Sequence, residues 1–164
     1  MRDAADIVRA VRASPRGMGR GLAGEGTWVS LAVWLFLLVS GGAVLAAAVW
    51  LTPDPAGHGT HTQLGLPPCG FLVASGLPCP GCGLTTSFSH MARLQVAGAF
   101  AANPFGVLLF LVTATGVGVS AVGVVRRWPV IRTLDRLHFE KVVIVLGVGA
   151  VAIWGARMAS VLAG

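Results

Sequence analysis

The sequence predicts an all-α integral membrane protein with three transmembrane helices, and three observations support this fold class. The 164-residue chain is 55% hydrophobic and only 11% charged, whereas a soluble domain carries about a quarter charged residues. Three apolar stretches are long enough to cross the roughly 30 Å hydrocarbon layer of a bilayer; they are residues 28–51, 105–125 and 142–162. Basic residues gather beside these stretches, before Glu25 and between Arg126 and Lys141, as is typical of membrane-protein loops.

The first apolar stretch follows a basic leader, residues 1–27, which contains five arginines. A short apolar face near its start favours a loose surface helix. Small residues near the end of 28–51 also fit a signal peptide, but its 24 residues exceed the usual apolar length of such a signal. We therefore expect a retained anchor and a single membrane domain over 28–164.

The distribution of basic residues predicts the side of the membrane on which each loop lies. Cytoplasmic loops carry an excess of Lys and Arg, which places the N-terminus and residues 126–141 inside. The loop 52–68 contains no Lys or Arg, so we place it outside, together with the cysteine motif that follows it. Arg157, near the end of the third span, then lies in the leaflet that borders the cysteines.

Residues 84–102 are predicted to form one amphipathic helix that lies along the outer interface or is re-entrant. At about 100° per residue, polar side chains share one face of this helix: Thr86, Ser89, His90 and Arg93. A central Arg in a span is costly, so the segment fits the membrane interface better than a fourth crossing. The same four residues are candidates to bind an anionic group. Asn103-Pro104 ends the helix, because the residue before proline is disfavoured in the α conformation.

The chain has three cysteines, which are the residues best suited to carry chemistry. Cys79 and Cys82 form a C-x-x-C motif across a Pro-Gly turn, and Cys69 lies ten residues earlier. A helix N-terminus stabilises a thiolate through its unpaired N–H groups and its dipole. Because Cys82 lies nearer than Cys79 to the N-terminus of the predicted helix, we expect it to be the more acidic thiol and to act with Cys79 as one unit.

Three interpretations of these cysteines are compatible with the sequence. In the first interpretation, two of the cysteines form a structural disulfide, which persists outside the cytoplasm. Alternatively, Cys79 and Cys82 exchange disulfides with partner proteins, with Cys69 as a resolving thiol. The third interpretation is a zinc site, for which the candidate ligands are Cys69, Cys79, Cys82 and His90. His58 and His61 are alternatives to His90 as the fourth ligand.

The run Gly-Leu-Pro-Cys-Pro-Gly-Cys-Gly-Leu-Thr at residues 76–85 resembles the signature of a bacterial membrane-protein family. That family is a domain of unknown function (number 2752) with a C-P-x-C-G-x-T-R core. Further features also resemble its pattern: Cys69, His90 and Asn103-Pro104. The resemblance implies a small multi-span protein of the bacterial plasma membrane and supplies no activity. This chain has Thr86 where the family has arginine, so a role of that arginine is lost or passes to Arg93.

The expected role is that of an accessory or interaction protein rather than an enzyme, with thiol–disulfide exchange and metal binding as alternatives. Its partners are the lipid bilayer and, through the small residues of the second and third spans, a membrane protein or a second copy. The net charge of +6 does not indicate nucleic-acid binding, because basic residues beside spans contact anionic lipid. Among the acidic residues only Asp54 falls outside, which leaves little for carboxylate catalysis.

Overall fold

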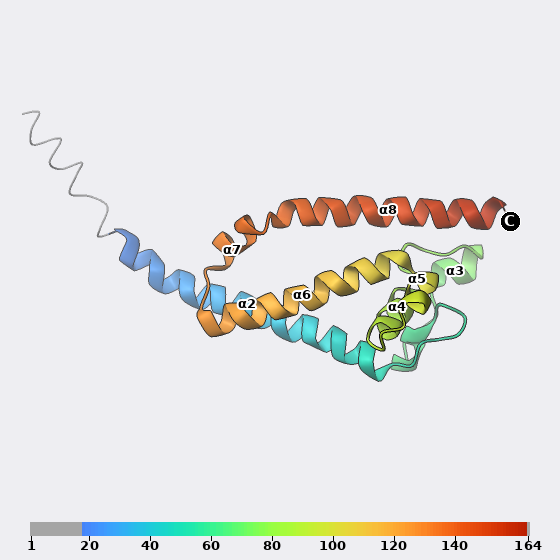
Figure 1. Cartoon of the computed structure of the whole chain (residues 1–164), viewed down its shortest axis with the longest axis horizontal. Helices are drawn as coiled ribbons and strands as arrows, with labels where there is room; N and C mark the ends of the chain where they lie inside the picture. Colours follow the sequence, from blue (N-terminus) through green and yellow to red (C-terminus); the bar gives the residue numbers. More distant parts are fainter. Residues whose placement is uncertain (1–17, 164) are drawn as a thin grey trace, which may run out of the picture.

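Figure 1 shows the computed structural model, which describes residues 18–163, with side chains described from Thr27 onward. This part of the chain is helical and contains no strand. Its three long helices are α2 (Met18–Trp50), α6 (Pro104–Arg126) and α8 (Phe139–Ala163). Each includes an apolar stretch long enough to cross a membrane, so the predicted all-α fold with three spans is confirmed. The expected leader helix falls on residues 1–17, outside the described residues, and on the start of α2.

Five short elements connect the long helices. Four of them follow α2 and lie near the start of α6, at one end of the molecule (Figure 1): η1 (Thr60–Leu64), α3 (Gly70–Ser75), α4 (Leu84–Met91) and α5 (Val96–Ala102). The fifth, α7 (Val130–Arg136), joins α6 to α8 at the opposite end. The cysteines and the basic connector therefore lie at opposite ends of the spans.

The single helix expected over 84–102 is wrong, because the chain breaks it into α4 and α5. Leu94 adopts a left-handed conformation with φ of 58°, which no α-helix continues. The His90 carbonyl accepts the N–H groups of both Arg93 and Gln95, each at 3.0 Å, and this turn folds α5 back against α4. The apolar periodicity of the segment continues through Leu94, so the break left no mark in the sequence pattern.

The helix α4 is packed inside the cysteine end and does not lie on its surface. It contacts α2, α5 and α6. Its polar Thr86, Ser87 and Ser89 are buried along with Phe88 and Met91. Gly106 allows this packing, since a Cβ at that position would lie 2.6 Å from Ser87 Oγ. Gly106 thus lets α4 and α6 approach closely within the chain, as small residues do between helices.

Helices α2 and α6 pack tightly at the opposite end as well. Trp34 is buried, and its Nε1 donates to the Trp128 carbonyl at 2.9 Å. A Cβ at Gly123 would lie 2.8 Å from the Trp34 ring. In contrast, no residue of α8 is buried, although α8 contacts α6 and α7. The lateral surface of α8 is thus left to lipid or to a partner.

Candidate functional site

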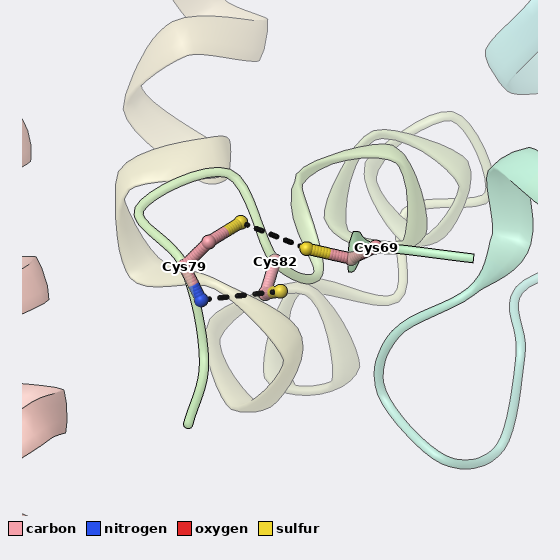
Figure 2. A group of neighbouring side chains, drawn as sticks. All are labelled: Cys69, Cys79 and Cys82. Atoms are coloured by element: carbon pink, nitrogen blue, oxygen red, sulfur yellow. Dashed lines mark hydrogen bonds between the residues drawn. The ribbon is translucent and has the colours of Figure 1, made fainter. Parts of the chain in front are cut away.

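The three cysteines come from two neighbouring turns. Cys69 is the N-cap of α3, which ends after two turns at Gly76, where φ is +71°. The Cys79–Cys82 turn is closed by the Cys82 N–H, which donates to the Cys79 carbonyl at 3.0 Å. Figure 2 shows that α3 and this turn bring the three side chains together.

The sulfur atoms form a compact group of thiols. All three Sγ atoms lie within 4.8 Å of one another. The sulfurs of Cys69 and Cys79 are 3.4 Å apart, and the backbone N–H of Cys79 donates to Cys82 Sγ at 3.3 Å (Figure 2). Cys69, whose place the sequence had left open, therefore belongs to the same group of sulfurs as Cys79 and Cys82.

The acidity of the thiols is the reverse of the sequence prediction. Cys82 is buried, and this burial, together with side-chain hydrogen bonding to the Cys79 thiol, raises the pKa of the Cys82 thiol to about 12. It gains little from α4, because Gly83, and not Cys82, is the N-cap of that helix. The pKa of Cys69 is lowered, first by the backbone N–H of Leu72 and then by hydrogen bonding to the other two cysteines. Cys69 is the N-cap of α3, although its side chain makes no capping hydrogen bond there.

Two side chains of α8 hold the cysteine turn. Arg157 Nη1 donates to the Cys82 carbonyl at 2.9 Å, and its Nη2 donates to the Ala102 carbonyl at 3.1 Å. Trp154 Nε1 donates to the Pro78 carbonyl at 3.0 Å. Arg157 thus lies beside the cysteine turn, where its planar fork joins two carbonyls as an arginine can.

Asn103 also holds the cysteine turn, whereas in the sequence it was interpreted as a helix end and as part of the family pattern. Its Oδ1 accepts the N–H groups of Phe105 and Gly106, which makes it the N-cap of α6. Its Nδ2 donates to the Cys82 carbonyl at 3.0 Å. Asn followed by Pro is the usual N-cap and N1 pair of a starting helix, so that signal was present. The hydrogen bond from Asn103 to Cys82 is a tertiary contact, and no signal for it was present in the sequence.

The four candidate anion-binding residues have separate surroundings. Thr86 Oγ1 shares a hydrogen bond of 2.8 Å with Thr60 Oγ1. Arg93 donates to the Ala48 and Val49 carbonyls, at 3.2 and 2.9 Å, and so satisfies the last turn of α2. Ser89 Oγ is buried and has no hydrogen-bond partner among the described residues.

His90 is also placed apart from the sulfur group. Its Nδ1 lies 2.7 Å from Gln95 Oε1, and its ring packs on Gly98. The structure therefore brings the three predicted cysteine ligands together without His90. The histidines that do share a cavity with the cysteines are His58 and His61.

The fold and the site define a helical membrane protein with a three-cysteine centre beside its spans. Residues 69–117 match a family described as Protein of unknown function (DUF2752). This match begins at Cys69, contains all three cysteines and Asn103, and ends within α6. It leaves out α2 and α8, and with α8 the arginine that binds the turn. No curated protein and no solved structure matches the chain.

Proposed function

We propose that this protein binds zinc at the three-cysteine centre, with Cys69, Cys79 and Cys82 as ligands. The observation that carries the proposal is the spacing of the sulfurs. Thiolates bound to one tetrahedral zinc ion at about 2.3 Å lie about 3.8 Å apart. The sulfurs of Cys69 and Cys79 are 3.4 Å apart and all three lie within 4.8 Å of one another, so a small adjustment places them around one ion.

The surroundings of the sulfurs support a metal centre. The Cys79 N–H that donates to Cys82 Sγ is the kind of outer contact that orients a metal ligand. Zinc with three thiolates carries a net charge of −1, and the Arg157 guanidinium donates to the carbonyl of Cys82 itself, which places an opposite charge beside the centre. In this proposal the ion stabilises the cysteine end, and the role remains non-catalytic.

The metal content of the protein tests the proposal directly. Purified in detergent without reductant or chelator, the protein is expected to contain stoichiometric zinc by elemental analysis, because structural zinc sites are worth about 10–16 kcal/mol. Serine at any one of Cys69, Cys79 and Cys82 is expected to abolish it. Ser75→Ala, in the exposed segment between the two turns, is the matched control and should keep the metal. Protein that contains no metal and does not bind added Zn²⁺ or Cu⁺ would contradict the proposal.

The 3.4 Å contact between Cys69 and Cys79 favours thiol–disulfide exchange as a second candidate. The Cys69 thiolate would attack a substrate disulfide and release one substrate thiolate. Cys79 would then attack the mixed disulfide at Cys69, which forms the Cys69–Cys79 disulfide and releases the second thiol. Mass spectrometry of the metal-free protein decides for this candidate if it finds that disulfide, and if Cys79→Ser traps mixed disulfides through Cys69.

We also propose that the cysteine end faces away from the cytoplasm in a bacterial plasma membrane, with the N-terminus and α7 inside. The support is the basic character of 126–141 and the absence of Lys and Arg from 52–68. An azide-bearing residue at Thr62 is expected to react with a membrane-impermeant dye in intact cells. The same residue at Arg132 should react only after the cells are opened. The reverse pattern would overturn this orientation.

A further inference from the structure

A cavity of about 540 Å³ opens beside the three cysteines. Its walls include the side chains of Cys69, Cys79 and Cys82 together with two histidines, His58 and His61. Three thiolates leave one position of a tetrahedral zinc ion open, and imidazole is a common fourth ligand. The residue that fills this position is therefore expected on the wall of this cavity.

His61 is better prepared than His58 to bind a metal ion. Its Nε2 lies 3.1 Å from the Pro67 carbonyl, and a carbonyl oxygen can only accept a hydrogen bond. Nε2 therefore carries the proton, and in the neutral ring Nδ1 holds the lone pair. A ligand histidine usually donates its other N–H to a backbone carbonyl or carboxylate, and here that carbonyl lies two residues before Cys69. His58 is exposed and has no such bond among the described residues.

The segment that carries His61 is joined to the cysteine turn. Thr60, directly before His61, is buried, and its hydroxyl bonds Thr86 in the first turn of α4, which begins two residues after Cys82. Gly59 and Gly65 close the segment with φ of +92° and +75°. A buried bond thus sets the position of η1, and with it the place of His61 on the wall of the cavity.

We propose that His61 supplies the fourth ligand through Nδ1 and completes a Cys₃His centre. This inference rests on the proposed zinc function. The compact group within 4.8 Å contains only sulfur atoms, so the imidazole turns toward them across the shared cavity when the metal binds. The centre is then closed, as structural zinc sites are, and it joins three segments of the cysteine end: η1, the N-cap of α3 and the Cys79–Cys82 turn.

The test compares histidine variants in metal binding. Zinc affinity is measured in the detergent-purified protein by competition with a chromophoric chelator, and Co²⁺ serves as a spectroscopic probe. His61→Ala is expected to weaken zinc by at least about 100-fold, since even outer contacts of a ligand are worth about 10–100-fold. It should also change the Co²⁺ visible spectrum. His61→Cys, which restores a donor, should recover the affinity. His58→Ala, on the same cavity, and His90→Ala, outside the group, should leave it unchanged.

The outcomes separate this inference from the zinc proposal. If the cysteine variants lose zinc while His61→Ala keeps full affinity and an unaltered Co²⁺ spectrum, the fourth ligand is not His61 and the inference fails alone. If His58→Ala has the larger effect, the inference fails as well. If the unaltered protein binds no metal, the zinc proposal itself fails. Equal thermal stability of metal-free His61→Ala and the metal-free unaltered protein excludes a folding defect as the cause.

Discussion

Alanine at Gly83 is expected to destabilise the cysteine end more than alanine at any other glycine of the motif. Gly83 has φ of +81°, a conformation that costs a residue with a Cβ about 1–2 kcal/mol. The added Cβ would also overlap the Ala102 carbonyl oxygen and lie 2.7 Å from that of Gly57. Both are backbone atoms, which cannot rotate away, and overpacking of this kind costs about 1–3 kcal/mol. The free energy of unfolding should fall by about 2–5 kcal/mol.

Two neighbouring glycines provide matched controls for this prediction. Gly76 has φ of +71° with open space around it, so Gly76→Ala carries the conformational cost alone. Gly81 has only Cys79 Sγ nearby, at 3.9 Å, so Gly81→Ala carries neither cost. In thermal unfolding in detergent, Gly81→Ala should have the highest midpoint, Gly76→Ala an intermediate one and Gly83→Ala the lowest. The Gly83→Ala midpoint should lie about 5–15 °C below that of the unaltered protein. A Gly83→Ala protein as stable as Gly76→Ala would show that the two carbonyls do not confine this position.

Glutamine at Arg157 is expected to release α8 from the cysteine end. No residue of α8 is buried, so once the two hydrogen bonds of Arg157 are lost, the bond from Trp154 Nε1 to the Pro78 carbonyl is left to hold α8 at this end. Hydrogen bonds to a charged group contribute about 1.5–3 kcal/mol each, so the loss of both is large relative to what remains. Pulsed EPR between labels carried by unnatural residues at Phe100 and Val161 should show one narrow distance distribution in the unaltered protein and a broad one in Arg157→Gln.

Lysine at position 157 distinguishes the effect of the hydrogen-bond geometry of the guanidinium from the effect of its positive charge. Arg157→Lys keeps the positive charge, but a single ammonium group replaces the fork that reaches two carbonyls, so its distance distribution should be intermediate. Arg132→Gln, at an exposed site on α7, is the control for loss of a basic residue and should behave as the unaltered protein. A distribution in Arg157→Gln as narrow as that of the control would show that the two carbonyl bonds do not hold α8.

The features that sequence predicted correctly are those set by local composition. In a bilayer, the backbone N–H and C=O groups of a single apolar stretch find hydrogen-bond partners only if the stretch is a helix, and the structure contains the three helices. The C-x-x-C turn was equally visible, because the spacing of Cys79 and Cys82 and the intervening Pro-Gly are local. The break at Leu94 was not, since an apolar residue in a left-handed conformation looks the same in the sequence as one within a helix.

The missed features of the site depend on contacts between distant residues. Arg93 satisfies carbonyls more than 40 positions away at the end of α2, and no local pattern specifies that partner. The acidity of Cys82 was predicted from its place before a helix, but burial raises its pKa and exceeds any effect of the helix terminus. His90 lay on the expected polar face and was a reasonable ligand for a continuous helix, whereas the observed turn directs its ring to Gln95.

The donors from α8 give the centre an order of assembly during translation. The ribosome completes Cys69, Cys79 and Cys82 long before it reaches Trp154 and Arg157, which both belong to the last helix. A nascent chain that has reached α7 therefore contains every thiol, while the Pro78 carbonyl still lacks its donor from α8 and the Cys82 carbonyl has only Asn103. Synthesis of the three thiols and the final fixing of the turn are thus separate events, and the second waits for insertion of the last span.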